Sequence, residues 1–146
     1  MSLLNKDIKK LVAYYKNFFG TSNPFKIAKQ LHIEIQIGDI GSKCGCYMYL
    51  KRHKCIFLNE NLEEHEMTLV MAHELGHAIM HPRENCYFIK HKTLLLNTKN
   101  EIEANKFAVE LLISDDFLEG NKDLTIEQVS RMLGYNKKLI ELRLTK

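Results

Sequence analysis

The sequence contains no apolar run of the roughly 20 residues that a membrane-spanning helix needs. Residues 1–7 also lack the charged-then-apolar order of a signal peptide. Without an export signal, the four cysteines are expected to be reduced thiols, and the cytoplasm is the expected compartment. These absences argue against a membrane protein and against a secreted domain held together by disulfides.

The sequence also has no large excess of positive or negative charge. A net charge of +3 with 27% charged residues gives no sign of a dedicated nucleic-acid surface. The pair Cys44-x-Cys46 is one residue too tight for the usual zinc knuckle. What the sequence does have is 45% hydrophobic residues in 146, enough for one ordinary core, so residues 1–146 are expected to form a single domain.

Two histidines stand four residues apart in the segment His73-Glu74-Leu75-Gly76-His77, with a carboxylate directly after the first. On a helix these imidazoles share one face, so both can bind one zinc ion while Glu74 reaches the water that the ion holds. The alternative is a pair of core histidines satisfied by backbone carbonyls. Because Glu74 and the surrounding sequence favour the metal site, the motif predicts the catalytic half of a zinc peptidase.

The surrounding sequence predicts one long buried helix over residues 61–81, which contain no proline. Asn59 and Asn61 mark its expected start, and His81-Pro82 its end. Its apolar residues include Leu62, Leu69, Val70, Ala72, Leu75, Ile79 and Met80. Buried histidines in such a helix need a partner.

A catalytic zinc site uses three protein ligands, so one must come from elsewhere in the chain. The metzincin pattern fails, because Met80 stands where glycine is needed and Arg83 where a third histidine would be. A second helix is expected over residues 101–113, and Glu101 heads its inner stripe. We therefore expect Glu101 as the third ligand, in the manner of gluzincins, with Glu103 in reserve. For either glutamate the alternative is a solvated first-turn carboxylate.

Several other residues are candidates for supporting roles. Asn105 lies one turn after Glu101 and could orient a ligand from behind. His81 repeats the four-residue spacing, but the helix should be ending there, so a structural or supporting role is expected. Between the two helices, Tyr87 and His91 are possible donors to the oxyanion, with ordinary rim residues as the alternative.

With these motifs the chain resembles the ImmA/IrrE family of metallo-endopeptidases, which are often encoded beside phage or mobile-element repressors. The resemblance is carried by residues 23–28, by 73–82 and by 101–113, and the tail 124–144 is similar to the family's closing helices. Members commonly end the second helix with Leu-Leu-Met-Pro, whereas this chain has Leu-Ile-Ser-Asp at 112–115. The resemblance implies a protein substrate, a helix-turn-helix repressor whose cleavage relieves repression.

The predicted fold is α+β and zincin-like, a mainly helical domain with about three strands packed beside the motif helix. Residues 1–60 are expected to hold N-terminal helices and the sheet, 61–114 the ligand-bearing helices, and 115–146 a helical hairpin. Helices are expected at about 4–19 and 24–31, and strands at 33–37, 46–50 and 55–58, the last two forming a hairpin around the basic turn 51–54.

The predicted function is that of an endopeptidase with one zinc ion, held by His73, His77 and Glu101, while Glu74 takes a proton from the water. A monomer with no membrane partner is favoured. The alternative is a non-catalytic, zinc-stabilised regulatory module that holds a repressor or DNA. Glu74 favours the enzyme, because a scaffold has no use for a carboxylate beside that water.

The tail leaves DNA binding as a further alternative. A capping box at residues 125–128 opens one helix, and a second helix at 136–144 carries Lys137, Lys138 and Arg143. This is the outline of a helix-turn-helix. A hairpin packed on the core is the favoured interpretation, because such a pair rarely stands without a third helix and the net charge is low.

Overall fold

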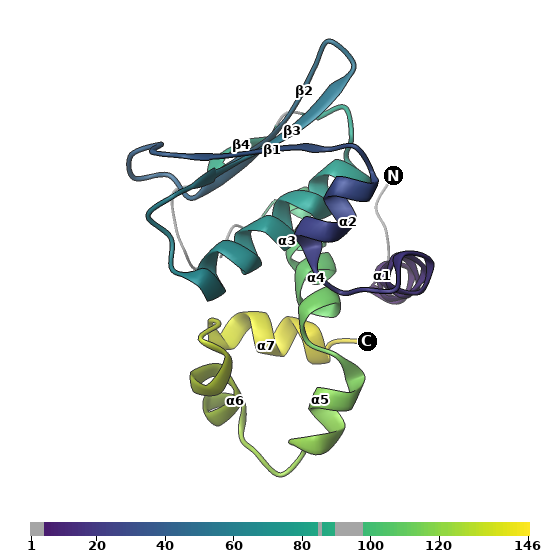
Figure 1. Ribbon diagram of the computed structural model, residues 1–146. Coiled ribbons are helices and arrows are strands. Elements are labelled where there is room, and N and C mark those ends of the chain that lie inside the picture. Colours follow the sequence, from purple (N-terminus) through teal and green to yellow (C-terminus); the bar gives the residue numbers. More distant parts are fainter. Residues whose placement is uncertain (1–4, 85, 90–97) are drawn as a thin grey trace.

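The computed structural model describes residues 5–84, 86–89 and 98–146, and it places a small sheet over a long central helix (Figure 1). The sheet has the order β1-β3-β2-β4. Its strands are β1 Glu34–Gly38, β2 Gly45–Leu50, β3 His53–Asn59 and β4 Cys86–Ile89. β1 runs parallel to β3, and the other neighbours are antiparallel. The first three strands are the predicted ones, whereas β4 was missed because four residues are too few for an alternating pattern.

The turn between β2 and β3 is tighter than the sequence predicts. Instead of the expected four residues, only Lys51 and Arg52 form the turn, with φ of 49° and 66°, and Leu50 pairs with His53. Two successive positive φ values suit the right-handed twist of a hairpin but are usually supplied by Asn-Gly or Asp-Gly. Because two long basic residues give no such signal, the sequence did not predict the tight turn.

Seven helices make the described part of the chain mainly helical, as predicted. They are α1 Asn5–Phe19, α2 Pro24–Gln30, α3 Glu64–Met80, α4 Lys99–Leu112, α5 Asp115–Gly120, α6 Ile126–Leu133 and α7 Lys137–Leu144. Across the described ranges, none of these helices combines the length and the apolar character that crossing a membrane requires.

The central helix α3 begins later than the asparagines predict. Its N-cap is Glu63, whose backbone N–H donates to the carboxylate of Glu66 at 3.2 Å. The side-chain amide of Asn59 instead donates to the carbonyl oxygen of Gly41 at 2.8 Å. Asn59 therefore closes the loop between β1 and β2 and does not cap the helix.

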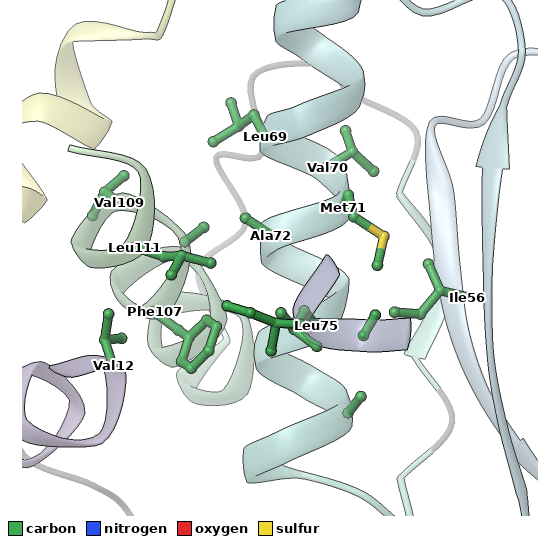
Figure 2. Packing of buried hydrophobic residues seen from close by; sticks show 14 of the residues in the cluster. Val12, Ile56, Leu69, Val70, Met71, Ala72, Leu75, Phe107, Val109 and Leu111 are labelled. Atoms are coloured by element: carbon green, nitrogen blue, oxygen red, sulfur yellow. The ribbon is translucent and has the colours of Figure 1, made fainter. Parts of the chain in front are cut away.

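The core forms on both sides of α3 (Figure 2). Ile56 of β3 packs on the sheet side and Phe107 on the α4 side, and both are fully buried. A Cβ on Gly76 would lie 3.1 Å from the Cβ of Phe107, so glycine permits the close approach of α3 and α4. Ala104 and Ala108 of α4 are also fully buried. This packing sets the separation between the two helices that carry the candidate ligands.

The C-terminal segment contains α5, which the sequence did not predict, followed by the expected helical pair. Ser114 caps α5 by accepting the backbone N–H of Phe117 at 3.0 Å. Thr125 and Gln128 form the predicted capping box of α6, with bonds of 2.8 and 3.1 Å. Gly134 follows with a φ of +76°, which suits a glycine at a helix end.

Helix α7 is fastened to α4 by buried charges. The ammonium of Lys106 donates to the carbonyl oxygen of Thr145 at 2.7 Å and lies 2.7 Å from Glu110. The guanidinium of Arg143 is 2.7 Å from Asp115 and 3.4 Å from Glu110. Arg143, one of the basic residues named for the DNA-binding alternative, is only 5% exposed, so its charge is directed into the protein. The helical pair packs on the core, which is the arrangement that the sequence favoured.

Candidate metal centre

Three side chains from two helices meet at one point. His73 and His77 lie one turn apart on α3, and Glu101 lies in the first turn of α4. The Nε2 atoms of the two imidazoles are 3.2 Å apart. Nε2 of His73 lies 2.8 Å from Oε2 of Glu101, and Nε2 of His77 lies 2.8 Å from the other oxygen, Oε1. The structure thus brings together the three residues that the sequence proposes as ligands, although Glu101 comes 24 positions after the nearer histidine, His77.

The size of this triangle fits a zinc ion. Bonds of about 2.0–2.2 Å in a tetrahedral site separate neighbouring donor atoms by about 3.3–3.6 Å. The 3.2 Å between the two Nε2 atoms is close to that range, the 2.8 Å contacts with the two oxygens of Glu101 are shorter, and one ligand atom from each residue lies within 4.8 Å of the others. Two imidazole nitrogens and a carboxylate oxygen are also donors that zinc accepts. Within the described ranges, no other group of three His, Cys, Asp or Glu side chains comes close enough to share an ion.

Asn105 fixes the ring of His73 in the orientation that a metal ligand needs. The Nδ1 atom of His73 lies 2.7 Å from Oδ1 of Asn105. An amide oxygen only accepts hydrogen bonds, so Nδ1 must carry the proton and donate. When a cation replaces the hydrogen bond from Nε2 to Glu101, the neutral ring keeps its proton on Nδ1 and turns the Nε2 lone pair toward His77 and Glu101.

The protonation preferences of the cluster suit cation binding. Burial alone would raise the pKa of Glu101, but the hydrogen bonds from His73 and His77 and their charges bring it well below its usual range. Burial lowers the pKa of His77, although the hydrogen bond that its Nε2 donates to Glu101 opposes this. An ionised carboxylate and a neutral imidazole are the forms that bind a metal.

Glu74 is completely buried, and neither of its carboxylate oxygens has a hydrogen-bond partner among the described residues. Burial raises its pKa well above the usual value, and the charge of Glu101 adds to the effect. An unpaired buried carboxylate is costly and rare, and such groups concentrate at sites of function. Glu74 is therefore a buried carboxylate on α3, beside the cluster, whose oxygens no described residue satisfies.

This cost predicts a dependence on pH in the metal-free protein. The pKa of Glu74 is raised in the folded state, so its contribution to stability is fully present below the ordinary value of 4.5 and is lost as pH rises. Glu74→Gln removes the charge. In excess chelator, the variant and wild type should be about equally stable at pH 4, and the variant should be about 1–3 kcal/mol more stable at pH 8. Urea unfolding at both pH values measures the difference, and a variant less stable at pH 8 would contradict it.

His81 and Glu103 lie next to the cluster but outside it. His81 ends α3, and its backbone N–H donates to the carbonyl oxygen of His77 at 2.7 Å. Its Nδ1 is 3.0 Å from Nδ1 of His77, and its Nε2 is 2.8 Å from Oε1 of Glu103. The structure therefore places Glu101, and not the reserve candidate Glu103, beside the two Nε2 atoms.

The candidate oxyanion donors stay predictions. Tyr87 belongs to β4, but its side chain falls outside the part of the chain that is described. His91 also lies outside the described residues.

Two residues that sequence reasoning missed brace the end of α3 from the sheet. Lys54 of β3 donates from Nζ to the carbonyl oxygen of Ala78 at 3.0 Å. The hydroxyl of Tyr47 of β2 donates to the carbonyl oxygen of Pro82 at 2.5 Å. Both contacts join residues more than 20 positions apart. Because they depend on how the sheet packs on the helix, no local pattern could have predicted them.

Comparison with known proteins identifies relatives of this chain. Residues 28–145 match the peptidase family described as the IrrE N-terminal-like domain. The chain is 38% identical over 145 residues to the "Uncharacterized immunity region protein 2" of Bacillus phage phi105, covering 97% of this chain and 89% of the relative. It is 34% identical over 116 residues to the "Metallopeptidase ImmA" of Bacillus subtilis (strain 168), covering 78% of this chain and 68% of the relative. The chain therefore belongs to the ImmA/IrrE family of metallopeptidases, defined by the IrrE N-terminal-like domain.

Proposed function

We propose that this chain is a zinc-dependent endopeptidase that cuts one specific protein, a helix-turn-helix repressor, in the cytoplasm. The observation that carries the proposal is the meeting of His73, His77 and Glu101 beside the buried, unpaired carboxylate of Glu74. The first three residues would hold one zinc ion. Glu74 would act as a proton acceptor, which a purely structural metal site does not need.

Each residue has a distinct task in peptide hydrolysis. A bound zinc ion supplies Lewis acidity, which polarises the scissile carbonyl and makes water acidic near neutral pH. Glu74 accepts the proton of the attacking water and then delivers it to the leaving amine. Burial, and then the charge of Glu101, raise the pKa of Glu74, so its protonated form is stable enough to hold the proton between the two steps.

Limited access to the site supports a selective enzyme. The side chains of His73 and His77 are fully buried, whereas that of Glu101 is 16% exposed. A substrate would therefore reach the cluster from the side of Glu101, where α4 begins. A site this enclosed is expected to act slowly on generic peptides and to require a particular protein segment.

The relatives support a repressor as the substrate. One is an immunity region protein of a phage, and another is named a metallopeptidase. Phage immunity depends on repression, so a protease from such a region has a natural target in the repressor encoded beside it.

Incubation with the helix-turn-helix repressor encoded nearest to its gene tests this function. Zinc-loaded protein is expected to cut the repressor at one site, chelator is expected to stop the reaction, and added zinc is expected to restore it. Cleavage that survives complete zinc removal would contradict the proposal. Tight binding of the repressor with no cleavage would instead favour the non-catalytic regulatory module.

A further inference from the structure

A chain of hydrogen bonds leads away from His77 on the side opposite its Nε2 atom. Nδ1 of His77 is 3.0 Å from Nδ1 of His81, and Nε2 of His81 is 2.8 Å from Oε1 of Glu103. We propose that His81 and Glu103 form a relay that positions His77 and fixes the proton on its Nδ1 atom, so that Nε2 is presented to the metal. The proposal rests on the metal centre proposed above.

Only one arrangement of protons satisfies every contact in this relay when Nε2 of His77 binds a cation. Metal-binding Nε2 carries no proton, so Nδ1 of the neutral ring must carry it and donate to His81. Nδ1 of His81 then has to accept, which places the His81 proton on Nε2. That proton is donated to the carboxylate of Glu103, a group that only accepts when ionised. The acid at the far end thus determines which nitrogen of His77 is free.

The fold holds the relay in place from two sides. The backbone N–H of His81 is bonded to the carbonyl oxygen of His77, so the two rings are fixed one turn apart at the end of α3. Glu103 comes from α4, two residues after Glu101, and the same helix therefore supplies a ligand and the end of the relay. The side chains of His81 and Glu103 are only 9% and 7% exposed, and hydrogen bonds are stronger when water is excluded.

The two candidate histidine ligands differ in the hydrogen-bond partners of their Nδ1 atoms. His73 donates to the neutral amide of Asn105, whereas His77 is connected through His81 to a carboxylate. A carboxylate behind a ligating imidazole raises its basicity and orients its ring more strongly than an amide does. The relay should therefore contribute to zinc affinity even though neither His81 nor Glu103 contacts the ion.

Zinc affinity of four variants, measured by competition with a chromophoric chelator, tests the relay. His81→Leu and Glu103→Leu should each weaken zinc binding by about 10–100-fold. Glu103→Gln should weaken zinc binding by less than either leucine variant, because its amide oxygen still accepts from His81 but carries no charge. Glu110→Gln is the matched control, since Glu110 is an equally buried carboxylate of α4 that pairs with Lys106 and Arg143. It should lower thermal stability and leave zinc affinity unchanged.

Nitrogen-15 NMR of the imidazoles in the zinc-loaded wild type provides a second measurement that does not depend on any variant folding. At pH 7.5 it should show a proton on Nδ1 of His77 and on Nε2, but not Nδ1, of His81. In folded His81→Leu, the Nδ1 proton of His77 should exchange faster with solvent. A proton on Nδ1 of His81 in the wild type would overturn the relay, as would leucine variants that bind zinc as tightly as wild type. Wild-type protein that binds no zinc would instead overturn the proposed function.

Discussion

Glu74→Gln is expected to abolish measurable cleavage of the repressor while zinc binding continues. General-base catalysis contributes about 10²–10⁴-fold, so the rate should fall by about a thousandfold or more. Glutamine has nearly the same shape as glutamate but cannot accept the proton of the attacking water. The ligands His73, His77 and Glu101 are untouched, so zinc stoichiometry should stay at one per chain. Single-turnover cleavage and metal analysis of the same preparation give both quantities.

Because Glu74 is buried, its substitution changes the interior of the site and leaves the molecular surface as it is. Its side chain is completely enclosed, so a loss of activity cannot be attributed to an altered surface. The same substitution is expected to stabilise the metal-free protein at pH 8, which separates a lost proton acceptor from a damaged fold. A variant that binds zinc and still cuts at a rate near wild type would remove Glu74 from the mechanism.

Glu101→Ala is expected to lower zinc affinity on the order of a thousandfold, because it removes one of three protein ligands and the only negative charge among them. The increase in the free energy of unfolding that zinc produces should fall together with the zinc affinity. Zinc at a thousand times its Kd stabilises a folded protein by about 4 kcal/mol, and most of this should be absent in the variant. Thermal unfolding with zinc and with chelator measures the change.

Ile102→Ala is the matched control for this substitution. Ile102 is the next residue of the same helical turn and is 42% exposed. Its replacement should leave zinc affinity and zinc-dependent stabilisation near wild type. A Glu101→Ala protein that binds zinc as tightly as this control would show that the third ligand lies elsewhere.

The part of the site that depends on local spacing could be predicted from the sequence. His73, Glu74 and His77 lie within two turns of one helix, and their relative positions follow from helical geometry alone. Predicting Glu101 required one further step, which was to identify the inward-facing residues of a second helix. The structure places Glu101 at the two imidazoles.

The role of Glu103 could not be predicted in the same way. Two residues along a helix turn the side chain by about 200°, so helical periodicity alone puts Glu103 on a face away from Glu101. In the structure, every residue of α4 from 103 to 111 is buried, because α1, α3 and α7 all pack around this helix. A periodic pattern indicates one buried face, and it fails when partners cover every face. The glutamates, Lys106 and Asn105 then find buried polar partners that are distant in sequence.

Fold prediction failed at short elements for a related reason. β4 and α5 have four and six residues, and neither is long enough for a repeating pattern to distinguish strand from helix. The longer elements α1, α3, α4 and the β2–β3 hairpin were all predicted because their apolar residues recur over several turns or alternate along two paired strands.

A crystal structure of the zinc-loaded protein, with anomalous scattering recorded at the zinc absorption edge, tests the metal centre most directly. The expected result is a single zinc ion at about 2.0–2.2 Å from Nε2 of His73, Nε2 of His77 and a carboxylate oxygen of Glu101, with Glu74 close by but not bound to it. Zinc bound by other side chains, or the three groups present without any ion in saturating zinc, would contradict the proposed centre.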